Sequence, residues 1–210
     1  MMGLIKKDLL MFKNSYKSLI ITFVMYIAYS FMFDMNMTFL FPFMIVMICL
    51  STFSYDDFNN WDSYAITLPK GRINVVKSKY IVTIVLLIIA TILGFTISLI
   101  TENIKNNPIN IKETLSEIFG LLLALAFMIS ILYPIIFKFG SEKGKIAMIT
   151  VGISIAGIVL LFTKYIKIDI SLDIIQNIEK FLPIICLALS TLMITISYNI
   201  AKKIYSKREF

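Results

Sequence analysis

Long apolar runs that alternate with short charged intervals constrain this chain more than any other feature of its sequence. Hydrophobic residues make up 59% of its 210 residues, charged residues make up 16%, and the mean hydropathy is +0.87. One soluble core cannot hide so much apolar surface. The charges lie between the runs, as expected when each charge at the centre of a spanning helix costs about 2.5–3.5 kcal/mol. The sequence therefore predicts an all-α integral membrane protein.

Six apolar runs are long enough to cross a bilayer, which takes about 17–25 residues as a helix. The predicted spans cover residues 18–33, 37–53, 80–100, 118–137, 146–162 and 181–200. An amphipathic segment with basic residues precedes them and predicts an interfacial helix over residues 2–17. We expect one membrane domain over residues 1–210.

Basic residues indicate the orientation of these spans. Fifteen of the 20 Lys and Arg residues lie in the N-terminal segment, in the two intervals after spans two and four, and in the C-terminal tail. Because basic loops stay in the cytoplasm, both termini are predicted to be cytoplasmic. The outer interval of residues 163–180 fits either a short element that dips into the membrane surface or an extended loop with one amphipathic turn.

The longest polar interval, between spans two and three, predicts an amphipathic helix over residues 54–68. At about 100° per residue, its two faces separate apolar from polar side chains. Ser54 and Asp57 form a capping-box pattern at its start, and Pro69 and Gly71 are expected to end it. One face carries Tyr55, Phe58, Trp61, Ala65 and Leu68, and the other carries Asp56, Asn59, Asn60, Ser63 and Thr67.

This helix can either adhere to the membrane surface or dock a protein partner. Its acidic residues Asp56, Asp57 and Asp62 suit anionic headgroups poorly. Aromatic side chains such as Trp61 and Phe58 are typical anchors of protein interfaces. The pattern therefore favours a protein partner.

Several kinds of chemistry find no support in the sequence. The chain has no histidine, which removes His-based acid–base catalysis and Ser-His triads. Cys49 and Cys186 lie in separate apolar runs and lack metal-ligand spacing. Residues 140–145 match the phosphate-binding loop only loosely, because the glycine spacing is one residue short and no Ser or Thr follows Lys145. The net charge of +7 is explained by membrane orientation rather than by nucleic-acid binding.

The predicted transport route also lacks the usual marks of ion coupling. Pumps and ion-coupled carriers place ionisable residues at membrane depth, and the centres of the six predicted spans contain none. A channel or a secondary carrier is therefore disfavoured. If ATP is used, a partner is expected to bind it.

The segment between spans two and three carries a family resemblance. Its pattern is Phe53-Ser54-Tyr55-Asp56-Asp57, Trp61-Asp62-x-Tyr64, Leu68-Pro69-x-x-Arg72 and Val76-x-Ser78-Lys79-Tyr80. With the interfacial helix and six spans, it resembles the small bacterial permeases of the ABC-2 exporter class. The resemblance is to permeases of peptide and antimicrobial-resistance exporters, among them exporters of phenol-soluble modulins.

The resemblance implies a non-enzymatic permease subunit in the bacterial plasma membrane. Residues 54–68 would be a coupling helix seated on a cytoplasmic ABC ATPase, which binds ATP and Mg²⁺, so this chain would need no cofactor or metal of its own. A second copy or a related permease would complete the pathway within membrane lipid, for export of amphipathic peptides or other hydrophobic or antimicrobial compounds. The implied docking residues are Tyr55, Asp56, Asp57, Phe58, Trp61, Asp62, Tyr64, Leu68 and Arg72.

An alternative function comes from a different class of protein. The chain could be a membrane immunity or sensor protein that binds an antimicrobial peptide without moving it. Co-purification of an ATPase from the native membrane separates the two functions, because only a permease subunit requires that partner.

Overall fold

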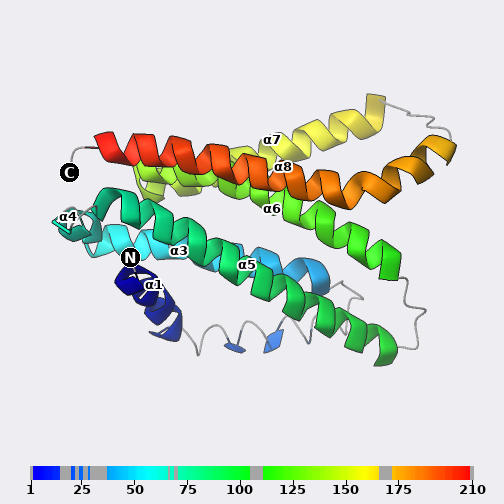
Figure 1. Ribbon diagram of the computed structural model, residues 1–210, viewed down its shortest axis with the longest axis horizontal. Helices are drawn as coiled ribbons and strands as arrows, with labels where there is room; N and C mark the ends of the chain where they lie inside the picture. Colours follow the sequence, from blue (N-terminus) through cyan, green and yellow to red (C-terminus); the bar gives the residue numbers. More distant parts are fainter. Residues whose placement is uncertain are drawn as a thin grey trace.

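The computed structural model describes residues 2–14, 20–21, 24–25, 28, 37–65, 67–68, 71–104, 111–165 and 172–208. These residues form helices and turns, with no strand among them. The helices are α1 (Met2–Asn14), α3 (Met37–Phe58), α4 (Trp61–Ala65), α5 (Gly71–Ile104), α6 (Ile111–Phe139), α7 (Ser141–Tyr165) and α8 (Leu172–Lys207). The long helices run along one axis, and α1, α4 and both chain termini lie toward one end (Figure 1). We call this the terminal end.

Each of the long helices contains one predicted span and extends beyond it. Four of them, α3, α5, α6 and α8, are long and apolar enough in their described parts to cross a membrane. The predicted span over residues 146–162 lies inside α7, many of whose side chains are outside the described part. The predicted span over residues 18–33 falls almost entirely outside the described residues, as does the centre of the outer interval at residues 166–171.

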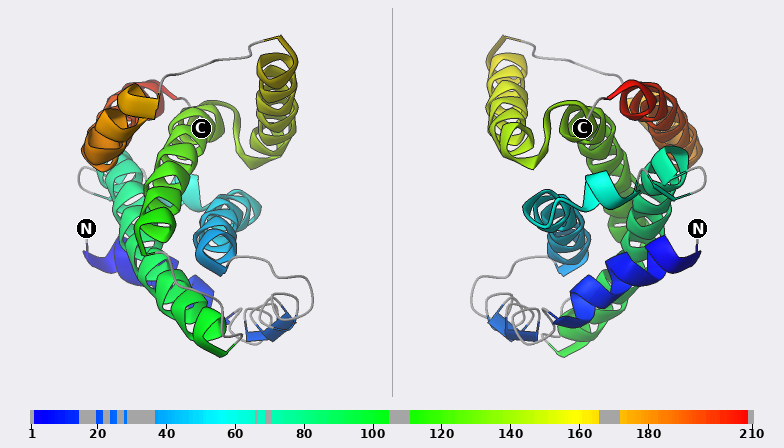
Figure 2. Two further views of the ribbon diagram at one scale, coloured as in Figure 1. Left: turned by 90° about the vertical axis from the view of Figure 1, so that its right-hand side faces the viewer. Right: turned by 90° about the vertical axis from the view of Figure 1, so that its left-hand side faces the viewer.

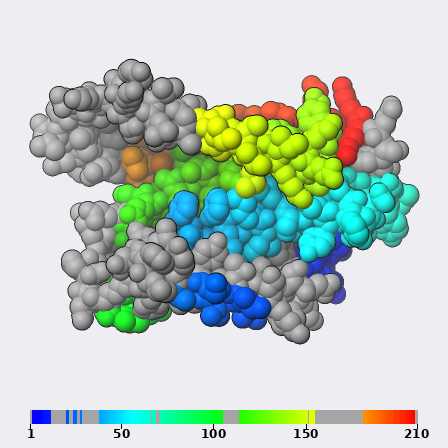
Figure 3. Space-filling model, turned by 180° about the vertical axis from the view of Figure 1, so that it is seen from behind, coloured from blue at the N-terminus to red at the C-terminus, as the bar shows by residue number. Residues whose placement is uncertain are grey.

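Two helix pairs make the most extensive contacts, α6 with α8 and α3 with α5. Helix α5 also packs on α8, and α1 packs on α5. Helix α7 stands apart from the bundle over much of its length (Figure 2). From the rear, α7 and α3 lie side by side toward the terminal end (Figure 3). The packing is therefore extensive between α6 and α8 and between α3 and α5, and it is sparse between α3 and α7.

A buried aromatic cluster forms the core near the terminal end. It consists of Phe53 from α3, Tyr80 from α5, Tyr133 and Phe137 from α6, and Tyr205 from α8. The rings meet edge to face, with centroids 5.0 Å apart for Phe53 and Tyr133, 5.0 Å for Tyr80 and Tyr133, and 5.2 Å for Phe137 and Tyr205. This geometry suits the charge distribution of aromatic rings. The cluster fixes four long helices beside the polar segment that follows α3.

Hydrogen bonds from hydroxyl groups join the helices and fix their register, which apolar packing alone specifies less strictly. The Tyr80 and Ser197 hydroxyls form a bond of 2.6 Å between α5 and α8, and Ser197 donates to the Ser130 carbonyl of α6 at 2.9 Å. Farther along the bundle, Thr38 donates to Ser98 at 2.9 Å. Such bonds between membrane helices contribute about 0.6 kcal/mol on average. They set the register between helices more than they set stability.

Candidate partner-docking surface

The prediction of one continuous helix over residues 54–68 is wrong. Helix α3 runs through Ser54 and ends at Phe58, so Ser54 does not cap a new helix. Asn59 and Asn60 form a turn, and Asn60 adopts φ of 48°. Asparagine tolerates this left-handed conformation better than most residues. The chain therefore bends sharply and begins the five-residue helix α4 at Trp61.

A second tight turn leads from α4 into α5. The Gly71 N–H donates to the Leu68 carbonyl at 2.8 Å. A Cβ atom at Gly71 would lie 1.8 Å from the Ala65 carbonyl oxygen, so no larger residue fits without a shift of the backbone. The segment is thus held close to the first turn of α5. Gly71 is the first residue of α5 and does not end a preceding helix as the sequence had predicted.

The inner face of this segment contains a buried set of charges, the acid–lysine cluster of Lys7, Asp8, Asp56 and Lys79. Lys79 lies 2.6 Å from Asp56 and 3.1 Å from Asp8, and it donates to Thr52 at 2.9 Å. Lys7 lies 2.5 Å from Asp56 and 3.3 Å from Asp8. Two acids and two lysines balance, as burial of charge requires. The cluster ties α1, α3 and α5 together.

Helix α1 also contacts α4 through the only tryptophan in the chain. The Lys7 ammonium lies 4.4 Å from the centre of the Trp61 ring, a cation–π geometry. The Trp61 and Tyr64 rings are 5.1 Å apart, and Trp61 is half-buried against the core. Trp61 therefore joins the short helix to the rest of the fold, in addition to any partner that it contacts.

The other two acids of the segment bind the start of α7 and the end of α8. Asp57 accepts a hydrogen bond of 2.6 Å from the Ser141 backbone N–H and so caps α7. Asp62 accepts a bond of 2.7 Å from the Tyr205 hydroxyl and lies 3.6 Å from Arg208. Burial raises the pKa of the Asp62 carboxyl above its usual value, although Tyr205 and Arg208 act in the opposite direction.

Arg72 and Arg208 complete the contacts at the terminal end. Arg72 donates to the Ser206 carbonyl at 2.6 Å, and Arg208 donates to the Phe137 carbonyl at 3.2 Å. Both bonds satisfy carbonyl groups near the ends of long helices. The segment and its charged neighbours thus contact five helices: α1, α5, α6, α7 and α8.

The outer face of the segment is aromatic and open. Tyr55, Phe58 and Tyr64 are 50%, 86% and 58% exposed, and we call them the aromatic surface. Asn59, Asn60, Ser63 and Thr67 surround them and are also exposed. Exposed aromatic residues with a polar surround are typical of binding sites.

The nine docking residues implied by the resemblance therefore divide into three groups. Tyr55, Phe58 and Tyr64 are exposed, and Trp61 and Leu68 are half-buried. The acids Asp56, Asp57 and Asp62 and the cation Arg72 bind other parts of the same chain. The sequence analysis did not identify Lys7 and Lys79 as the partners of Asp56, or Asp8 and Thr52 as further contacts of Lys79. Its one available signal was Asp8, an acid within an otherwise basic N-terminal segment.

The chain as a whole is similar to one known protein family. A family model described as "ABC-2 family transporter protein" matches residues 3–206. The chain belongs to this family. No curated protein and no solved structure matches it.

Membership in the ABC-2 family makes the chain a membrane permease subunit of an ABC transporter. It also implies association with ABC ATPase subunits. The four described helices that can cross a membrane agree with a multi-pass membrane protein. The open aromatic surface lies on the segment that the resemblance assigned to ATPase contact.

Proposed function

We propose that this ABC-2 permease is an exporter subunit that docks its ATPase through the aromatic surface of Tyr55, Phe58 and Tyr64. The observation that carries the proposal is the contrast within one short segment. Its acids are bound to the permease itself, whereas three large aromatic side chains on it are at least half exposed. Such side chains are suited to pockets on a partner, where burial of an anchor contributes most of the binding energy.

The contacts behind the aromatic surface offer a route by which movement of an ATPase reaches the membrane helices. Asp57 holds the N-terminus of α7, Asp56 holds α1 and α5, and Asp62 holds the end of α8. A push on Phe58 therefore acts on several helices at once. A rigid-body tilt of these helices is the expected response.

The rest of the proposed assembly follows the resemblance. The terminal end faces the cytoplasm of a bacterial cell, a separate ATPase binds ATP and Mg²⁺, and a second copy or a related permease completes the pathway. The cargo is an amphipathic peptide or another hydrophobic or antimicrobial compound. Spans rich in Ile, Leu, Phe and Met support this choice because they offer apolar contact and few fixed hydrogen bonds.

Co-purification from the native membrane tests the docking proposal. An affinity-tagged chain is expected to retain an ABC ATPase, and Phe58→Asp is expected to weaken its retention by about thirtyfold, as loss of an anchor worth about 2 kcal/mol predicts. Phe139→Asp is the matched control, because Phe139 is 48% exposed at the same end of the bundle but lies outside the segment.

Two results would refute the proposal. Recovery of the tagged chain with no ATPase would favour the membrane immunity or sensor function. Equal loss of the ATPase from both Asp variants would show that a charge anywhere at the terminal end disturbs binding.

A further inference from the structure

A groove opens between α3 and α7, with α6 at its floor. Its volume is about 580 Å³. The apolar part of its wall comes from Met47 and Leu50 of α3, Leu132 and Ile136 of α6, and Met148 of α7. Methionine side chains adapt to flexible apolar partners. The groove is thus large and apolar enough to hold part of a hydrocarbon chain.

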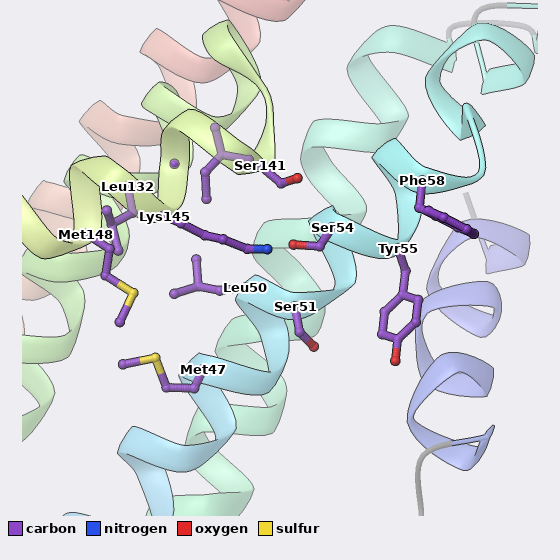
Figure 4. Close-up of a pocket in the computed structure, with 12 residues that line it drawn as sticks. Met47, Leu50, Ser51, Ser54, Tyr55, Phe58, Leu132, Ser141, Lys145 and Met148 are labelled. Atoms are coloured by element: carbon purple, nitrogen blue, oxygen red, sulfur yellow. The ribbon is translucent and has the colours of Figure 1, made fainter.

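One end of this groove is polar. Lys145 of α7 extends across it toward Ser54 of α3, and Ser51 also lies on this side (Figure 4). Tyr55 and Phe58 of the aromatic surface also line the groove, and their rings point away from Lys145 (Figure 4). The polar end is the one nearer the Asn59–Asn60 turn, at the terminal end of the bundle.

Lys145 differs from the other lysines around it. Lys7 and Lys79 pair with carboxylates, and Lys138 and Lys143 lie 4.8 Å and 5.6 Å from the centre of the Phe139 ring. Among the described residues, Lys145 is within ion-pair distance of no carboxylate. The groove therefore presents one cation that no acid in the described part of the chain neutralises.

We propose that this groove binds one anionic phospholipid from the leaflet at the terminal end. Its phosphate lies between the Lys145 ammonium and the Ser54 hydroxyl, and an acyl chain lies along Met47, Leu50 and Met148. A lysine that keeps its charge at the headgroup level while its stem lines an apolar surface is common at membrane interfaces. The site depends on the chain being a membrane protein and not on ATPase docking.

The lining favours a lipid over a peptide or a second copy of the chain. A peptide backbone brings N–H and C=O groups that need partners, and most of this wall offers only hydrocarbon and sulfur. A second copy would bring the same positive charge to the terminal end, where Lys138, Lys143 and Lys145 lie, and the whole chain has a net charge of +7. An acyl chain with a phosphate satisfies both ends of the groove.

Native mass spectrometry of the full chain in mild detergent tests this site. The probes are palmitoyl-oleoyl phosphatidylglycerol and the zwitterionic phosphatidylcholine with the same acyl chains. The wild type is expected to retain one phosphatidylglycerol in preference to phosphatidylcholine. Lys145→Gln is expected to reduce this preference about tenfold, as loss of a charge-assisted bond predicts.

Lys143→Gln is the matched control, because it removes the same charge two residues away on α7, outside the groove lining. It is expected to leave the preference unchanged. Met47→Trp, which fills the apolar end, is expected to reduce retention of both lipids. Because the measurement uses the permease alone, it is independent of whether Phe58 docks an ATPase.

Three results would overturn the proposal. Equal losses in Lys145→Gln and Lys143→Gln would indicate attraction to overall charge. Equal retention of the two lipids by the wild type would remove the role of Lys145. Displacement of bound phosphatidylglycerol by an amphipathic peptide at equal concentration would assign the groove to the peptide instead.

Discussion

The inner and outer faces of residues 54–68 differ in what holds their side chains. On the inner face, Asp56 lies in a buried cluster with Lys7 and Lys79. On the outer face, Phe58 is 86% exposed and touches little of its own chain. The helical pattern placed these residues on opposite faces of one helix, and the family resemblance assigned both to one docking site. The structure shows that residues close together in the sequence have two different roles: some attach the segment to the rest of the chain, and others form an open surface.

The greatest loss of stability is expected when a charge is removed from the acid–lysine cluster on the inner face. Lys79→Met removes a cation from between Asp8 and Asp56 and leaves buried negative charge unpaired, which costs about 3–5 kcal/mol. Thermal unfolding of the purified permease in detergent measures this loss. Lys77→Met, an exposed position two residues earlier on α5, is the control and should behave like the wild type. Equal stability of the two variants would remove the cluster as the anchor of the segment.

A smaller loss of stability is expected from a substitution in the turn between α4 and α5. Gly71→Ala forces a Cβ atom against the Ala65 carbonyl oxygen, and overpacking of this kind costs about 1–3 kcal/mol. Gly120→Ala adds the same atom where nothing lies within 4 Å and should be neutral or slightly stabilising. Unfolding midpoints of the two variants are the measurement. A Gly71 variant as stable as the Gly120 variant would mean that the segment is not tightly held.

Truncation of Trp61 and truncation of Phe58 are expected to differ in their effects on stability. Trp61→Ala should lower the stability of the permease by about 1–2 kcal/mol, because a half-buried ring loses its packing and its contact with Lys7. Phe58→Ala should change stability by less than about 0.5 kcal/mol. Chemical or thermal unfolding without any ATPase present separates the two. Equal costs would contradict the assignment of the two rings to different faces.

The smallest expected effect concerns Asp62. Its pKa is raised in the folded protein, so the folded state holds a proton more readily than the unfolded state. Stability from this group is therefore present at low pH and is lost as the pH rises through the raised pKa. The wild type should gain stability relative to Asp62→Asn as the pH falls from 7 toward about 4. A gain in the opposite direction would contradict the burial of Asp62.

The sequence predicted the helical bundle well because its apolar runs are longer than those of soluble proteins. The five predicted spans after residue 36 all fall inside observed helices. The first predicted span, residues 18–33, lies almost entirely outside the described residues. Helix ends were less predictable, because α3 continues five residues past the predicted end of its span.

The site was harder to predict because its partners are distant in sequence. Asp8 and Lys79 are 71 residues apart, and Asp62 and Tyr205 are 143 residues apart. Nothing in a helical wheel shows that Asp56 faces inward to meet such partners. The turn at Asn59 and Asn60 also breaks the regular spacing on which the two predicted faces depended. ATPase docking by the aromatic residues stays a prediction.

Photo-crosslinking from position 58 directly tests whether the aromatic surface docks an ABC ATPase. A benzophenone amino acid replaces Phe58 in one sample and Phe139 in the other, and the intact membranes are irradiated. We predict that the probe at position 58 crosslinks to an ABC ATPase subunit and that the probe at position 139 does so far less. Crosslinks from position 58 only to lipid, or equal ATPase crosslinks from both positions, would contradict docking through the aromatic surface.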